Sequence, residues 1–173
     1  MHETSDDFAA LQAVLDRSYE LAGNHLRDIH APERRLSAAD LAERLTGMCL
    51  LTLATTTRNG RPITGPVDGV FFRGAFHFGS SPDSLRFRHL AARPHVSATH
   101  LPGEHLAVTV HGIATRVDVD APTNSEFRET LLGIYLPQYG DSWREVMDSG
   151  VFARIEPDRM FTYAAPPEAQ ESP

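Results

Sequence analysis

The spacing of hydrophobic residues divides the chain into a helical first quarter and a longer part with strand-like patterns. In residues 6–28, apolar residues recur every three or four positions, the period of an amphipathic helix. Ser37 followed by Asp40 has the form of a capping box, and Gly47 stands where a helix is expected to stop. We therefore predict a long helix and a short helix, joined by a loop at residues 31–35.

From Met48 onward the pattern changes to short apolar and β-branched runs. Residues 48–57 predict a buried strand, and Asn59-Gly60 is the strongest short signal for a hairpin. The return strand is expected at 61–72, and Arg73-Gly74 is expected to turn the chain into a third strand that ends at Phe78. Three further strands are predicted at 95–101, 106–119 and 151–163, with a bulge at Gly112 and a candidate break at 156–158. Helices are predicted at 84–92 and 125–136, and another opens at Ser142-x-x-Glu145 and closes at Gly150.

Six short strands at regular spacing are typical of an antiparallel barrel rather than a parallel sheet. The predicted fold class is therefore mainly β with flanking helices (α+β). We expect three regions: a helical N-terminal extension at 1–47 that packs on the barrel, the barrel with its inserted helices at 48–163, and a Pro-rich disordered tail at 164–173.

Composition narrows the possible partners. The chain of 173 residues carries 23 acidic and 16 basic side chains, a formal net charge of −7, which argues against a nucleic-acid-binding protein. All of the basic residues are arginine, so a phosphate group would have to be held by arginine, hydroxyl groups or backbone N–H groups. No apolar run is long enough to cross a bilayer, and the acidic N-terminus does not resemble a secretory signal. We predict a cytoplasmic protein whose single cysteine, Cys49, is a buried and inert thiol.

Nine histidines raise the question of a metal site. His100, His105 and His111 lie on a predicted turn and strand, but no cysteine pattern or HExxH motif accompanies them. We therefore predict no metal site. An axial haem ligand at His100 or His111 stays open at this point.

The strongest chemical signal is the segment from Gly79 to Arg86, where a strand ends and a helix begins. A glycine, the two hydroxyls of Ser80 and Ser81, and the exposed N–H groups of a helix start stand together there, with Arg86 in the first helical turn. Two interpretations compete. The segment is either an anion-binding site or a helix start capped by serine or aspartate side chains.

The surroundings of this segment favour the anion-binding interpretation, because their order resembles a known family. Asn59-Gly60-Arg61-Pro62, a β hairpin, Gly79-Ser80-Ser81, and Ser84-Leu85-Arg86-Phe87-Arg88-His89-Leu90 leading to Pro94 resemble the pyridoxamine 5'-phosphate oxidase-like proteins. This resemblance implies a split antiparallel β-barrel of the FMN-binding type. It also implies a homodimer with the cofactor site at the interface, with Trp143 or Tyr135 reaching toward the partner's pocket.

The resemblance also implies a set of cofactor-binding residues. A basic residue at the position of Arg86 meets the cofactor phosphate, small or hydroxyl residues line the same site, and the return strand passes the isoalloxazine ring by its backbone. On this chain the implied residues are Arg61, Pro62, Thr64, Val67, Phe78, Gly79, Ser80, Ser81, Ser84 and Arg86. No catalytic residue is predicted, because hydride transfer belongs to the cofactor.

The chain also departs from the pattern of the true pyridoxamine phosphate oxidases. Leu85-Arg86 stands where those enzymes have two adjacent basic residues, and Gly65 and Val70 stand where they have an Arg and a Lys for the substrate. The first hypothesis is therefore an FMN-dependent oxidoreductase that acts on a different small molecule. A second keeps the fold with the deazaflavin coenzyme F-420, for which Arg58, Arg61 and Arg88 are candidate contacts. A third is a flavin- or haem-binding sensor or storage protein without turnover.

Overall fold

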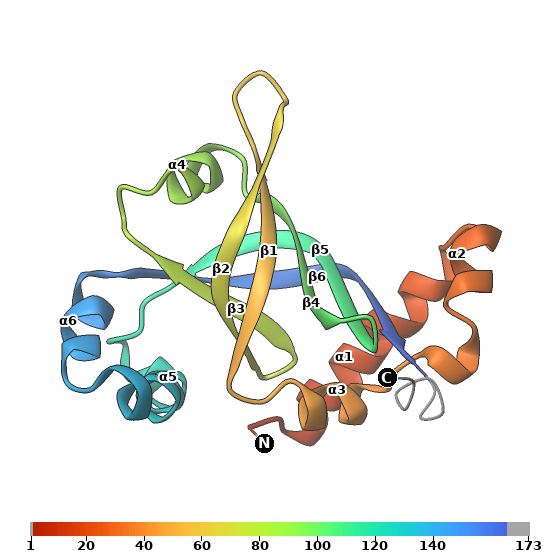
Figure 1. Ribbon diagram of the computed structural model, residues 1–173, viewed down its shortest axis with the longest axis horizontal. Helices are drawn as coiled ribbons and strands as arrows, with labels where there is room; N and C mark the ends of the chain where they lie inside the picture. The colour runs from red at the N-terminus through yellow and green to blue at the C-terminus, as the bar shows by residue number, and fades with distance from the viewer. Residues whose placement is uncertain (1, 166–173) are drawn as a thin grey trace.

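Six antiparallel strands close into a barrel in the computed structural model, which describes residues 2–165 (Figure 1). The strands are β1 (Met48–Thr56), β2 (Pro62–Phe72), β3 (Ala75–Ser80), β4 (His95–Gly103), β5 (Leu106–Val117) and β6 (Val151–Ala164). Their order around the barrel is β1-β2-β3-β6-β5-β4, and β4 closes the ring by pairing with β1. The predicted fold class, α+β with an antiparallel barrel, is confirmed.

Strict alternation along β1 explains how the barrel wall forms. Cys49, Leu51 and Leu53 point into the core and are at most 2% exposed, whereas Leu50 and Thr52 face outward. The pair β1–β2 continues to Thr56 opposite Pro62, so the hairpin projects beyond the rest of the barrel (Figure 1). Burial raises the pKa of the Cys49 thiol to about 11, as expected for an inert buried cysteine.

The longest strand pair, β5 with β6, contains the predicted bulge. Its register shifts between His111 and Gly112, and the residue opposite Gly112 is Pro157. A proline has no N–H to give to the ladder, so it is tolerated at such an irregularity. The candidate break at 156–158 is therefore wrong, because β6 runs through Pro157 as one strand. It also includes Ala164, the first residue of the predicted tail. Ala165 donates its N–H to the His105 carbonyl at 2.9 Å, and the rest of the predicted tail, 166–173, lies outside the described residues.

The helices precede the barrel or connect its strands. They are α1 (Ser5–Glu20), α2 (Asn24–Ile29), α3 (Ala38–Arg44), α4 (Leu85–Ala92), α5 (Ser125–Tyr139) and α6 (Ser142–Ser149), with 3₁₀ turns at Pro32–Arg34 and Pro122–Asn124. The single helix predicted over 6–28 is two helices, since the chain leaves helical geometry after Glu20 and restarts at Asn24.

Two predicted capping boxes had different outcomes. The box of Ser37 and Asp40 is present at the start of α3, and its hydrogen bonds lower the pKa of the Asp40 carboxyl. The box of Ser142 and Glu145 is wrong: Asp141 precedes α6 without a side-chain cap, and the Ser142 hydroxyl donates to the Tyr139 carbonyl instead. Gly150 does close α6, as predicted.

The helices cover two separate parts of the barrel and create two hydrophobic clusters. Leu11 and Leu15 of α1 pack in the barrel's own core, and the Tyr19 hydroxyl donates to the Thr162 carbonyl of β6 at 2.8 Å. On another side, α5 and α6 lie against the outer faces of β2, β3 and β6 and form a second cluster around Phe127 and Phe152 (Figure 1). The candidate site lies between this second layer and the barrel. Among residues 2–165, no helix is long and apolar enough to span a membrane.

Candidate functional site

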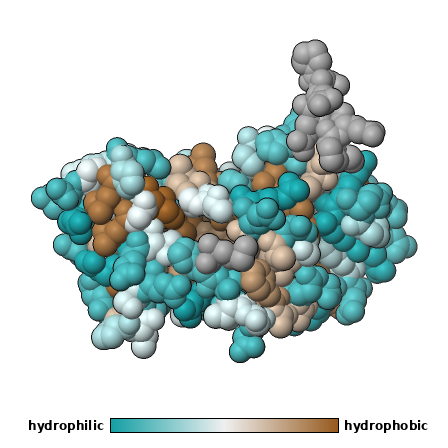
Figure 2. Space-filling model, turned by 90° about the horizontal axis from the view of Figure 1, so that it is seen from below, coloured by the Kyte–Doolittle hydropathy of each residue, from teal (hydrophilic) through white to brown (hydrophobic). Residues whose placement is uncertain are grey.

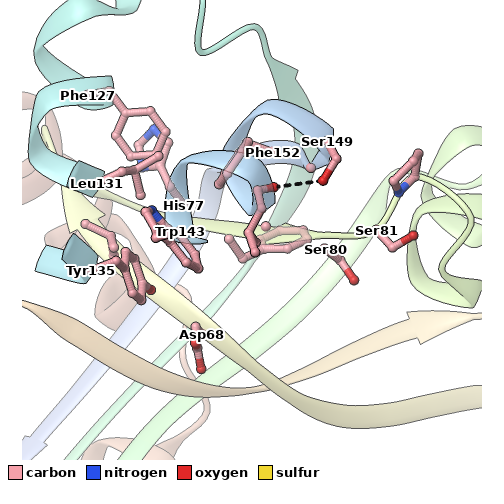
Figure 3. A pocket seen from close by; sticks show the side chains of 16 residues that line it. Asp68, His77, Ser80, Ser81, Phe127, Leu131, Tyr135, Trp143, Ser149 and Phe152 are labelled. Atoms are coloured by element: carbon pink, nitrogen blue, oxygen red, sulfur yellow. Dashed lines mark hydrogen bonds between the residues drawn. The ribbon is translucent and has the colours of Figure 1, made fainter. Parts of the chain in front are cut away.

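A cavity of about 510 Å³ lies between the outer face of the barrel and the α5–α6 layer (Figure 3). Strands β2, β3 and β6 form one wall, and the residues after β3 form the rim. Hydrophobic side chains also gather at the surface of the end that holds α5 and α6 (Figure 2). A volume between 300 and 1,000 Å³ with a mostly apolar lining is typical of a small-molecule site.

His77 of β3 forms part of the floor of this cavity. Its Nδ1 lies 3.2 Å from the Ala75 carbonyl, and its ring lies 4.4 Å from the Phe127 ring. Burial, together with the charge of Arg154 on the paired strand, lowers the pKa of His77 to about 3. The imidazole is therefore neutral near pH 7 and adds no charge to the cavity.

The α5–α6 wall is built from aromatic rings. Tyr135 and Trp143 are stacked with ring centroids 4.1 Å apart, and Tyr139 continues the stack at 6.0 Å from Trp143. Figure 3 shows Tyr135 and Trp143 on the same side of the cavity, with Asp68 of β2 facing the same end. Burial and the Asp68 carboxylate raise the pKa of the Tyr135 hydroxyl, so it stays protonated across the physiological range.

Tyr135 and Trp143 both line the cavity of their own chain, and Tyr135 is only 3% exposed. The reach of Trp143 or Tyr135 toward a partner's pocket stays a prediction. The homodimer itself stays a prediction.

Arg86 joins the cavity rim to strand β2. Its Nη2 donates to the Pro66 carbonyl at 2.9 Å, and its Nη1 lies 3.4 Å from the Ser80 hydroxyl, which it contacts as a donor. Within residues 2–165, Arg86 forms no ion pair with a carboxylate. Burial lowers the pKa of its guanidinium, but an arginine remains charged at any physiological pH. Its positive charge is consequently available to an anion.

At the helix start beside Arg86, some serines cap the helix and another faces the cavity, so each of the two interpretations of residues 79–86 applies to part of the segment. Ser84 is the N-cap of α4, since its hydroxyl accepts from the Phe87 N–H at 3.3 Å. The Ser81 hydroxyl accepts a weaker contact from the Asp83 N–H at 3.4 Å. Ser80 instead lines the cavity and meets Arg86. The capped-helix interpretation therefore applies to Ser84, and Ser80 with Arg86 is left as the anion-binding candidate.

The structure distributes the predicted cofactor-binding residues over four places. Phe78, Gly79, Ser80 and Ser81 line the large cavity. Thr64, Ser84 and Arg86 line a neighbouring hollow of about 190 Å³ at the base of the β1–β2 hairpin. Arg61 and Pro62 are exposed at the hairpin, and Val67 is buried in the barrel core. Arg86 and Ser80, in contact, connect the first two groups.

Gly79 allows this arrangement because another residue would collide with the opposite strand. A Cβ at this position would lie 2.7 Å from the ring of Phe152, the partner of Gly79 across the β3–β6 ladder. Glycine therefore lets the Phe152 ring pack directly on the end of β3 and form part of the cavity wall.

Residues suggested for the other cofactors lie elsewhere. His100 and His111 lie on β4 and β5, with their Nδ1 atoms against the Leu50 carbonyl and the Ser97 hydroxyl. Arg58, Arg61 and Arg88 do not line the large cavity. No group of three or more potential metal ligands occurs in the part of the chain that the structure describes.

Sequence reasoning missed most of the α5–α6 wall, including Phe127 and Leu131, and it missed His77. The helix at 125–136 was predicted, but its apolar face could equally have packed against the barrel without leaving space. The useful signal was His77 itself, a polar residue inside an otherwise apolar strand.

Comparisons with known proteins identify the fold. No protein-family model matches the sequence, and no curated protein matches it. Among solved structures, a FAD-binding protein from Mesorhizobium loti is 23% identical with a TM-score of 0.57, over 77% of this chain and 98% of that one. The haem storage protein HutZ from Vibrio cholerae is 18% identical with a TM-score of 0.55, over 66% of this chain and 85% of its own. A putative pyridoxamine 5'-phosphate oxidase from Listeria innocua is 15% identical with a TM-score of 0.50, over 65% of this chain and 86% of its own.

Proposed function

We propose, on the premise that this chain shares the split-barrel fold of the pyridoxamine 5'-phosphate oxidase-like proteins, that it is an FMN-dependent oxidoreductase. The FMN phosphate would bind Arg86, Ser80 and Ser81, and the ring would enter the large cavity. One observation carries the proposal: Arg86, free of any carboxylate partner in residues 2–165, contacts a hydroxyl on the rim of an aromatic-lined cavity.

The residues present fit such a cofactor in charge, donors and space. A phosphate needs positive charge and hydrogen-bond donors, which the Arg86 guanidinium and the hydroxyls of Ser80 and Ser81 supply at one end of the cavity. A planar ring needs apolar walls, which Phe78 and Phe152 supply in this cavity. One of the similar solved structures is named as a FAD-binding protein. FAD has the same ring system as FMN and carries a phosphate at the same place on its ribityl chain.

FMN, when bound, supplies the hydride chemistry. The protein's own residues bind and orient it and keep water away. Arg86 fixes the phosphate end, and its bond to the Pro66 carbonyl holds the guanidinium against β2. The neutral His77 and the surrounding rings keep the cavity floor apolar, which strengthens every electrostatic contact inside it.

The substrate is expected to differ from pyridoxamine phosphate. Gly65 and Val70 stand at the positions where the resemblance places an Arg and a Lys for the substrate. A Cβ on Gly65 would lie 3.8 Å from Arg86 Nη2, and Val70 is 3% exposed in the second hydrophobic cluster. Neither position offers a charge to a second phosphate group.

Changing Arg86 to alanine should weaken FMN binding by about 10- to 100-fold. Charge-assisted hydrogen bonds contribute about 1.5–3 kcal/mol, and each 1.4 kcal/mol is a factor of ten in affinity. Quenching of flavin fluorescence on titration into the purified protein would measure the dissociation constant.

Arg88→Ala is the matched control, because Arg88 lies exposed on the same helix and its substitution removes the same charge. It should retain the wild-type affinity, and urea unfolding should show that both variants are folded. Equal FMN affinity of wild type and Arg86→Ala would contradict the phosphate assignment. A haem Soret band in the purified protein would instead favour haem. Tight binding of a deazaflavin by a protein that does not bind FMN would favour coenzyme F-420.

A further inference from the structure

Among the described residues, Asp68 is the one formally charged side chain on the wall of the large cavity. The other lining residues are apolar, carry hydroxyl groups or, in Trp143, an indole N–H, and His77 is neutral near pH 7. Asp68 lies on β2 opposite Leu50 of β1, and its side chain is partly buried. Within residues 2–165, its carboxylate forms no hydrogen bond and no ion pair. Partial burial of an unpaired carboxylate has a free-energy cost, which a bound cation would offset.

Aromatic rings surround the same end of the cavity. Trp143 is stacked on Tyr135 with ring centroids 4.1 Å apart and an interplanar angle of 21°, so the two rings lie nearly parallel. Figure 3 places both rings at the Asp68 end, away from Ser80 and Ser81 at the other end. Because the Asp68 charge contributes to the raised pKa of Tyr135, the carboxylate and the phenol act on one another across this end. Electron-rich rings beside a carboxylate attract cations, and organic ammonium ions in particular.

We propose that the Asp68–Tyr135–Trp143 end of the cavity is a binding subsite for an organic cation, an amine or a pyridinium ring. This cation would be the substrate class of the oxidoreductase, and that assignment rests on the proposed function. Its binding requires only residues of this end and does not require FMN. The −7 formal charge of the chain, with no lysine present, also favours the approach of cations over anions.

The chain provides its own probe for this test, because Trp143 is its single tryptophan. N-methylquinolinium and quinoline form a matched pair, one cationic and one neutral at a pH where quinoline is unprotonated. Titration with either, followed by Trp143 fluorescence and by calorimetry, measures occupancy of this end. We expect the cation to bind about tenfold more tightly than the neutral ring.

Asp68→Asn keeps the shape of the side chain and removes its charge, so it should abolish the preference for the cation. Asp83→Asn is the control, because it removes the same charge at a residue that is exposed near the cavity rim and does not line the cavity. It should preserve the preference. Circular dichroism and urea unfolding would show that both variants are folded.

Equal affinity for the two probes, or an undiminished preference in Asp68→Asn, would overturn the subsite. These outcomes are separate from failure of the proposed function. The titration is run on protein without flavin and repeated on Arg86→Ala. Retained cation binding in a wild-type protein that binds no FMN would leave the subsite standing and reject the flavin assignment.

Discussion

Replacing Gly112 with alanine is expected to destabilise the fold by about 3 kcal/mol or more, because the added methyl group would overlap backbone atoms. A Cβ at this position would lie 2.0 Å from the Glu156 carbonyl oxygen and 3.2 Å from the Pro157 Cα. Neither contact is with the flexible end of a side chain, so relief requires the β5–β6 pair to separate at its bulge. This pair is the longest ladder in the barrel.

Urea unfolding followed by circular dichroism would measure this loss. Gly133→Ala is the matched control, because Gly133 lies exposed on α5 and its added Cβ would meet nothing within 4 Å. In the control, alanine should stabilise the helix slightly, by up to about 1 kcal/mol. A Gly112→Ala protein as stable as the wild type would show that β5 and β6 do not approach this closely.

His77→Phe is expected to make the protein less sensitive to acid. The pKa of His77 in the folded protein is about 3, below the ordinary value of about 6.5 expected in the unfolded chain. Between these values the unfolded chain binds a proton that the folded chain excludes, so the free energy of unfolding falls as the pH falls. The loss from this one group approaches about 1.4 kcal/mol per pH unit, and it vanishes above about pH 6.5.

The measurement is the unfolding free energy from pH 7 down to about pH 4 for wild type and variant. Phenylalanine suits the site because the rings of Phe72 and Phe127 already pack on His77. His111→Phe, at an exposed position on β5, is the matched control and should retain the wild-type slope. Parallel pH profiles for wild type and His77→Phe would show that His77 titrates normally in the folded protein.

Local signals in the sequence were sufficient to predict the barrel. Arg73-Gly74 turns between β2 and β3 with both residues at positive φ, and the alternation of Cys49, Leu51 and Leu53 identifies the inner face of β1. Such features depend on neighbouring residues alone. The break after Glu20 was not predicted, because apolar residues continue at helical spacing across it. The backbone nevertheless leaves the helical conformation there and resumes it at Asn24.

The candidate site was only partly predictable for a related reason. Ser80 and Arg86 are six residues apart and belong to one strand-to-helix connection, so their proximity follows from local structure. Asp68, His77 and Tyr135 come from three separate elements, and only the packing of α5 against β2 and β3 brings them to one cavity. No spacing rule connects residues 68 and 135.

In the proposed function, the large cavity binds FMN with its phosphate at Arg86 and Ser80. The most direct test compares FMN with riboflavin, which has the same ring and side chain but no phosphate, in titrations of the wild-type protein. Charge-assisted contacts to the phosphate predict that FMN binds about 10- to 100-fold more tightly than riboflavin. Equal affinity for the two, or no measurable binding of either, would contradict the account.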